Sequence, residues 1–67
     1  MKATKEKFEN RFHKHMNYVV KHIDEVGGWK YAVENVWLAL CEDFELNWKE
    51  NEYEDLFDEL VENYEFY

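Results

Sequence analysis

The chain contains no proline and no serine, and only one threonine, one cysteine and two glycines among its 67 residues. A single cysteine excludes the intrachain disulfide framework on which many small secreted domains depend. The lack of serine excludes a Ser-based catalytic triad, and two glycines cannot build a glycine-rich phosphate loop. These absences exclude several common enzyme classes, and we predict that the protein is not an enzyme.

Metal and cofactor sites are not expected either. His13 and His15 are two residues apart, so on a helix they point in different directions. His15 and His22 share a side but are seven residues apart, roughly 10.5 Å along a helix axis. Neither pair has the i, i+4 spacing at which two histidines bind one metal. We predict no catalytic, cofactor-binding or metal-ligating residues, and we place the histidines at the surface or the core edge. There, His15 and His22 could contribute to a pH-dependent interface.

Long apolar runs are also missing. The longest, Val36–Cys41, is far shorter than a membrane-spanning helix. The charged N-terminal residues are not followed by the apolar segment of a signal peptide. A lone cysteine inside an apolar run is typical of a buried small hydrophobe, and an unpaired thiol fits a reducing compartment. We therefore expect a soluble, cytoplasmic protein with Cys41 in its core.

Aromatic side chains, in contrast, are abundant. Five Phe, five Tyr and three Trp make up 19% of the residues, and hydrophobic residues make up 46%. A chain of this length buries only about 60% of its unfolded surface, and aromatic side chains supply large buried areas. The composition predicts a single acidic helical domain over residues 1–67, because it is too apolar for a disordered acidic tail.

Hydrophobic spacing predicts an all-α fold with three helices, at roughly residues 4–26, 29–44 and 48–65. Thr4 is the expected N-cap of the first helix. The Gly27–Gly28 pair is expected to end that helix with a left-handed cap. The apolar stripes that define the helices are Phe8, Phe12, Met16, Val19, Ile23 and Val26, then Trp29, Val33, Val36, Trp37, Leu40 and Phe44, and finally Tyr53, Leu56, Phe57, Leu60, Val61 and Tyr64.

The second of these helices is expected to be the central one. Tyr31 and Leu38 lie on the side opposite its apolar stripe. A helix that is apolar on more than one side is usually covered by neighbours. Short connections between three helices indicate an up-down-up bundle. The alternative is a helical dimer in which one element packs across chains.

The segment before the third helix contains two candidate caps. Asn47 is followed three residues later by Glu50, and Asn51 by Glu54. Both arrangements are similar to a capping box, so one of the two asparagines is expected to start the third helix. Leu46 and Trp48 are expected to cover the loop side of the core.

The charges are divided almost cleanly between the two halves of the chain. Residues 1–33 carry seven Lys or Arg and four Asp or Glu, a balance of +3, whereas residues 34–67 carry one Lys and twelve carboxylates, a balance of −11. Helical periodicity gathers these charges into two faces that point away from the shared core. The basic stripe consists of Lys7, Arg11, Lys14, Tyr18 and Lys21, and the acidic face consists of Glu54, Asp55, Asp58, Glu59, Glu62 and Glu65.

Because both faces point outward, one monomer cannot easily neutralise its acidic face with its own basic stripe. Direct nucleic-acid binding is disfavoured, since a net charge of −8 repels a polyanion. Membrane binding is disfavoured because the apolar face of the first helix is needed for the core. A charged face that only keeps the protein soluble is the simplest interpretation. The functional interpretation is mimicry of nucleic acid, since carboxylates about 5–6 Å apart on successive helical turns can imitate backbone phosphates.

Mimicry predicts a basic partner, possessing a nucleic-acid-binding groove lined by Lys and Arg, which the acidic face occupies. Aromatic residues near the rim would supply the desolvated anchors that charge alone does not. The candidate rim anchors are Trp48, Tyr53, Phe66 and Tyr67.

In size, acidity, aromatic content and lack of catalytic apparatus, the chain resembles small phage-encoded inhibitors of bacterial nucleic-acid enzymes, such as anti-restriction and anti-CRISPR proteins. The resemblance is one of composition over the whole chain, so it implies an inhibitory function but no residue roles. The basic stripe departs from that pattern. It favours an alternative, a self-associating structural or adaptor protein, in which the stripe of one copy meets the acidic face of another in a homodimer.

Overall fold

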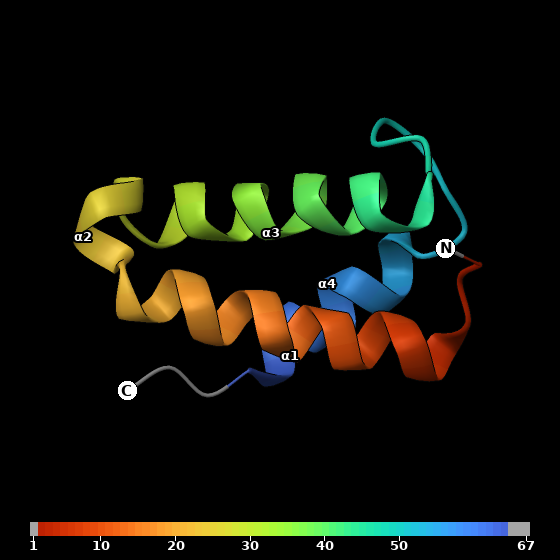
Figure 1. The fold of residues 1–67 in the computed structure, drawn as a ribbon, viewed down its shortest axis with the longest axis horizontal. Coiled ribbons are helices and arrows are strands. Elements are labelled where there is room, and N and C mark those ends of the chain that lie inside the picture. Colours follow the sequence, from red (N-terminus) through yellow and green to blue (C-terminus); the bar gives the residue numbers. More distant parts are fainter. Residues whose placement is uncertain (1, 65–67) are drawn as a thin grey trace.

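The computed structural model describes residues 2–64 of the chain, and within them it contains four helices and no strands (Figure 1). The all-α prediction is confirmed, although the number and bounds of the helices differ from those expected. The helices are α1 (Lys5–Lys21), α2 (Ile23–Val26), α3 (Trp29–Phe44) and α4 (Glu54–Asn63). In Figure 1, α1 and α3 lie side by side and antiparallel, α2 joins them at one end, and α4 lies behind α1.

Both caps predicted for the first helical segment are present. The Thr4 hydroxyl oxygen accepts a hydrogen bond from the backbone N–H of Lys7 at 3.2 Å. Gly27 has a left-handed φ of 94°, and the N–H of Gly28 donates to the carbonyl of Ile23 at 3.0 Å. This pair of features is the Schellman arrangement, which glycine enters without steric strain.

The segment predicted as one helix over residues 4–26 is interrupted at His22. The backbone there has φ −118° and ψ 30°, and its N–H donates to the carbonyl of Val19 at 3.1 Å. The single turn of α2 then carries the chain toward α3 and packs Ile23 and Val26 against the core. The apolar spacing continues across the break, which is why the spacing alone predicted an uninterrupted helix.

The last helix is much shorter than the predicted range of 48–65. It begins at Glu54 and ends at Asn63, and residue 65 lies outside the described part of the chain. Its N-cap is Tyr53, which makes no side-chain capping hydrogen bond. The prediction that Asn47 or Asn51 would start this helix is therefore wrong.

The two asparagines instead organise the connection between α3 and α4. Asn47 Oδ1 accepts from the N–H of Lys49 at 3.0 Å, and Asn51 Oδ1 accepts from the N–H of Tyr53 at 2.8 Å. The amide nitrogen of Asn51 also donates to the Asn47 carbonyl at 2.9 Å. The bonds accepted by the two side-chain oxygens are Asx-type turns, which compete with helix formation. They hold residues 45–53 as a compact, turn-rich segment.

The core lies where α1, α3 and α4 meet. The Phe12 and Phe57 rings meet edge-on with centroids 5.7 Å apart. The centroid of the Trp37 ring lies 4.9 Å from that of the Phe57 ring. Cys41 is buried and Leu46 is half-buried against the core, as predicted. The buried core residues are Phe8, Phe12, Met16, Val19, Ala32, Val36, Leu40, Cys41, Phe44 and Phe57.

The outer side of α3 is largely exposed, so the expectation that this helix is central is wrong. Tyr31 is 56% exposed and Leu38 is 41% exposed. The central helix is α1, which contacts each of the other three, because the short α4 packs mainly against it. Trp48 is 57% exposed, so it does not cover the core either.

Candidate functional site

The acidic face lies on the solvent-exposed part of α4, away from the buried Phe57. Phe57 is the buried residue through which α4 is anchored to the rest of the molecule. Glu65, the last predicted member of the face, lies outside the described residues. The described members, all of which are exposed, are Glu54, Asp55, Asp58, Glu59 and Glu62.

Ion pairs within the described residues involve only histidines. His15 Nε2 lies 2.7 Å from Asp43 Oδ2, linking α1 to α3, and His22 Nδ1 lies 3.2 Å from Glu25 Oε2. Across residues 2–64, no Lys or Arg nitrogen lies within 4.0 Å of a carboxylate oxygen. The basic stripe and the acidic face thus do not neutralise one another within this part of the chain.

The basic stripe runs along α1, with Arg11 half-buried and its other four members exposed. A shallow hollow of about 280 Å³ is lined by Lys7, Asn10, Arg11 and Lys14. Tyr18 is 65% exposed, and its ring centroid lies 4.7 Å from that of His22. The stripe is therefore accessible along its length.

The candidate rim anchors differ in how they are placed. Tyr53 is half-buried, and its ring stacks on Phe8 with centroids 4.9 Å apart. Trp48, in contrast, stands well exposed in the segment between α3 and α4. Phe66 and Tyr67 lie outside the described residues.

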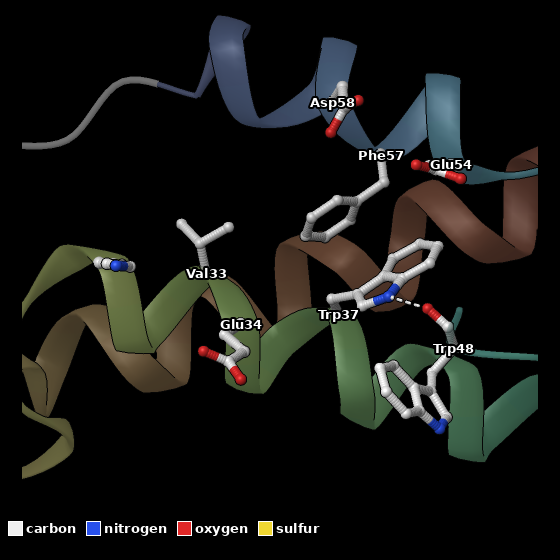
Figure 2. Close-up of a pocket in the computed structure, with 8 residues that line it drawn as sticks. Val33, Glu34, Trp37, Trp48, Glu54, Phe57 and Asp58 are labelled. Carbon is white, nitrogen blue, oxygen red and sulfur yellow. Dashed lines mark hydrogen bonds between the residues drawn. The ribbon is translucent and has the colours of Figure 1, made fainter. Parts of the chain in front are cut away.

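A cleft between α3 and α4, which the sequence did not predict, brings aromatic and acidic side chains together (Figure 2). We call it the acid-rimmed cleft. Its volume is about 330 Å³. The apolar lining consists of Val33, Trp37, Trp48 and Phe57, and the charged lining consists of Lys30, Glu34, Glu54 and Asp58. The cleft exists because α4 packs mainly against α1 and leaves space beside α3.

A hydrogen bond fixes one end of the acid-rimmed cleft. The indole N–H of Trp37 donates to the carbonyl oxygen of Trp48 at 2.9 Å, which ties residues 45–53 to α3 (Figure 2). A second hollow of about 540 Å³ adjoins the cleft and shares Glu34, Trp37 and Trp48 with it. Leu38 and Lys49 complete the lining of that hollow. These three shared residues therefore form the centre of a larger concave surface.

Part of this site could have been found from the sequence. Lys30, Glu34 and Trp37 have helical spacings of four and three, so they share one side of α3. Trp48 could not have been added by spacing, because the Asx turns of the connecting segment determine where it lies. Glu54 and Asp58 were predicted as part of the acidic face, but not as a wall facing α3.

The remaining reactive groups do not form a catalytic or metal site in the described residues. Burial raises the pKa of the Cys41 thiol, and a hydrogen bond from Asn51 Nδ2 at 3.7 Å partly opposes that rise. A raised pKa keeps a thiol protonated and unreactive. Residues 2–64 contain no group of three or more His, Cys, Asp or Glu arranged to hold a metal ion.

None of the helices in the described region combines the length and the apolar character needed to cross a membrane. Comparison with protein-family models, with curated proteins and with solved structures finds no match to this chain.

Proposed function

We propose that this protein binds a basic protein partner through the acidic face of α4, and that it inhibits a nucleic-acid-binding enzyme by occupying the basic groove of that enzyme. One observation carries the proposal: the described carboxylates of the acidic face are exposed, and no Lys or Arg of residues 2–64 pairs with them. Such a face carries an electrostatic potential that a basic groove would neutralise.

The fold supports a row of charges held in fixed positions. Phe57 anchors α4 against Phe12 and Trp37, so the outward carboxylates are presented from a packed helix. Carboxylates on successive turns lie about 5–6 Å apart. Over ten residues, α4 extends about 15 Å. That length is short for an interface, so aromatic contacts beside the row would have to add affinity.

The compartment we propose for this interaction is the cytoplasm. Cys41 is a free, buried cysteine, and unpaired thiols are usual in the reducing cytoplasm. Nucleic-acid enzymes of the proposed kind act there.

Charge reversal tests the proposal. The variant Asp58→Lys, Glu59→Lys, Glu62→Lys reverses the middle of the acidic face while leaving Phe57 in place. The matched control reverses three exposed carboxylates elsewhere, Glu6, Asp24 and Glu42.

Each immobilised variant is exposed to bacterial lysate at low and high salt, and the captured proteins are assayed for DNA binding and for competition by duplex DNA. We expect the wild type and the control to capture a DNA-competed protein that salt releases. We expect the variant with Asp58, Glu59 and Glu62 reversed to lose capture of this protein while keeping its helical circular dichroism. Equal capture by both triple variants would reject the proposal.

Self-association is the second candidate function, and the exposed basic stripe with its hollow on α1 favours it. In a symmetric dimer, each contact between the stripe of one copy and the acidic face of the other occurs twice. Sedimentation should then show a dimer at low salt that dissociates as salt is added. A monomer at every salt concentration rejects this candidate.

A further inference from the structure

We infer that the acid-rimmed cleft is a pocket for an arginine side chain presented by the basic partner. The inference rests on the proposed function and specifies the chemistry by which the partner is recognised. It is carried by three features of the cleft: aromatic rings, a resident cation beside one of them, and unpaired carboxylates on two walls.

The aromatic part of the cleft is held in place by its own contacts. Trp37 and Phe57 lie with ring centroids 4.9 Å apart at an interplanar angle of 51°. The indole N–H of Trp37 is satisfied by the carbonyl oxygen of Trp48 at 2.9 Å. Since these rings are already positioned, a ligand that contacts them loses little free energy in ordering them. Aromatic faces attract cations through the ring quadrupole.

The chain itself places a cation beside the cleft, in the adjoining hollow. Lys49 Nζ lies 5.4 Å from the centroid of the Trp48 ring. This distance is within the limit of about 6 Å at which an ammonium group is attracted to an aromatic face. Trp48 is 57% exposed, so its ring also has surface available to a partner. The resident ammonium group therefore indicates the charge of the ligand that this surface accepts.

The carboxylates complete the chemistry. Glu34 extends from α3, while Glu54 and Asp58 extend from α4, so acidic groups stand on both sides of the rings (Figure 2). Lys30 is the only base in the lining, and Lys49 lies beside Trp48, so the local balance is three negative charges against two positive. None of the three carboxylates lies within 4.0 Å of a Lys or Arg nitrogen in the described residues. A cationic ligand would supply the missing counter-charge.

Among cationic side chains, arginine fits this combination best. Its planar guanidinium stacks on aromatic rings, and its five N–H donors form a fork that can reach carboxylates on two walls. A lysine ammonium is compact and more strongly hydrated. The volume of about 330 Å³ is near the lower end of ligand pockets, which run from about 300 to 1,000 Å³. A single side chain suits that volume better than a larger ligand does.

The test titrates the full chain with two capped peptides of equal length, one carrying three arginines and the other three lysines, by isothermal calorimetry. We expect the arginine peptide to bind more tightly. Trp48→Ala and Glu34→Gln should each weaken its binding by about two- to fivefold. The matched controls are Tyr18→Ala, an exposed aromatic on α1, and Asp24→Asn, which removes an exposed carboxylate of α2 that does not line the cleft. Both controls should change binding by less than about 1.5-fold at physiological salt, because distant charges are screened.

Lys49→Gln provides a gain-of-affinity test that a purely structural role would not pass. Removing the resident ammonium group should strengthen binding of the arginine peptide by about two- to fivefold, because it frees the Trp48 ring. The control is Lys7→Gln, which changes the net charge equally at an exposed position on α1. Equal effects of the two substitutions would show that the ring is not the site.

The pocket and the proposed function fail in different ways. If the two peptides bind equally, if neither binds, or if Glu34→Gln and Asp24→Asn weaken binding equally, the arginine pocket is wrong, whereas the acidic face can still be the binding surface. If reversal of Asp58, Glu59 and Glu62 leaves partner capture unchanged, the proposed function is wrong. Selective loss in Trp48→Ala and Glu34→Gln supports the pocket.

Discussion

Glu45 occupies a backbone conformation that usually belongs to glycine. At the end of α3 it has a φ of 57°. The N–H of Glu45 donates to the carbonyl of Glu42 at 3.4 Å, and the N–H of Leu46 donates to the carbonyl of Cys41 at 2.8 Å. This is the Schellman arrangement again, with glutamate at the left-handed position. A left-handed conformation costs a non-glycine residue about 1–2 kcal/mol.

Glu45→Gly should therefore raise the free energy of unfolding, by about 0.5–1 kcal/mol after allowing for the greater freedom of glycine in the unfolded chain. Urea denaturation measures the change. Glu45→Gln is the control, because it removes the same carboxylate but keeps the strain. If the two variants are equally stable, relief of charge repulsion rather than of backbone strain explains the gain.

Cys41 gives the protein a specific pH dependence. Burial raises the pKa of this thiol above its ordinary value of 9.0. The folded state then holds the thiol proton more tightly than the unfolded state does, so stability falls as pH rises above about 9 and toward the folded pKa. We expect the difference in unfolding free energy between wild type and Cys41→Ala to shrink across that range. A difference that stays constant with pH would contradict the burial of this thiol.

The helix α4 contributes one buried side chain to the core, and Leu56, Leu60 and Val61 pack against the core around it. Phe57 is its buried residue, and its ring meets Phe12 from α1 and Trp37 from α3. Truncation of a buried phenylalanine typically costs about 3–5 kcal/mol. Phe57→Ala should therefore release α4 or unfold this small domain.

Hydrogen exchange distinguishes those two outcomes, since local release would leave amides of α1 and α3 protected while those of α4 exchange. Leu60→Ala is a control on the same helix, at a half-buried position, and should have a smaller effect. Unchanged protection of α4 in Phe57→Ala would show that other contacts hold the helix.

The elements also show what the sequence could and could not predict. The all-α class, the Thr4 cap, the Gly27 turn and the stripe around Phe8 and Phe12 follow from local periodicity and capping chemistry, and all were predicted. The break at His22 was missed because apolar spacing continues across it.

The start of α4 was missed for a different reason. Asn47 and Asn51 can cap a helix or close an Asx turn with the same side-chain oxygen, and here they close turns. This choice shortens α4, leaves Tyr31 and Leu38 uncovered on α3, and brings Trp48 beside Trp37. The acidic face was therefore predictable as a helical pattern, whereas the acid-rimmed cleft depended on tertiary packing.

Folding does not resolve the division of charge between the two halves of the chain. Although α4 packs against α1, the Lys and Arg of the basic stripe do not pair with carboxylates within residues 2–64. A net charge of −8 therefore acts on a domain whose small core leaves a limited stability margin. The same unpaired carboxylates that make a basic partner favourable make the isolated domain less stable.

Salt should therefore stabilise the protein on its own. The acidic face contains three like-charge i, i+4 pairs, Glu54 with Asp58, Asp55 with Glu59 and Asp58 with Glu62. Each destabilises the helix by about 0.2–0.5 kcal/mol, so screening should add about 1 kcal/mol to the free energy of unfolding. For a domain of this size, that corresponds to a rise in Tm of about 4–8 °C. Thermal unfolding at increasing NaCl concentrations measures this rise in Tm.

The variant Asp58→Asn localises the effect, because Asp58 takes part in two of the three pairs. It should be more stable than wild type at low salt and gain less from added NaCl. Asp24→Asn changes the net charge equally but lies in α2, outside these pairs, so its response to salt should remain close to that of wild type. If Asp24→Asn and Asp58→Asn respond alike, the repulsion is a property of the net charge and not of α4. The acidic face would then have no special electrostatic strain for a basic partner to relieve.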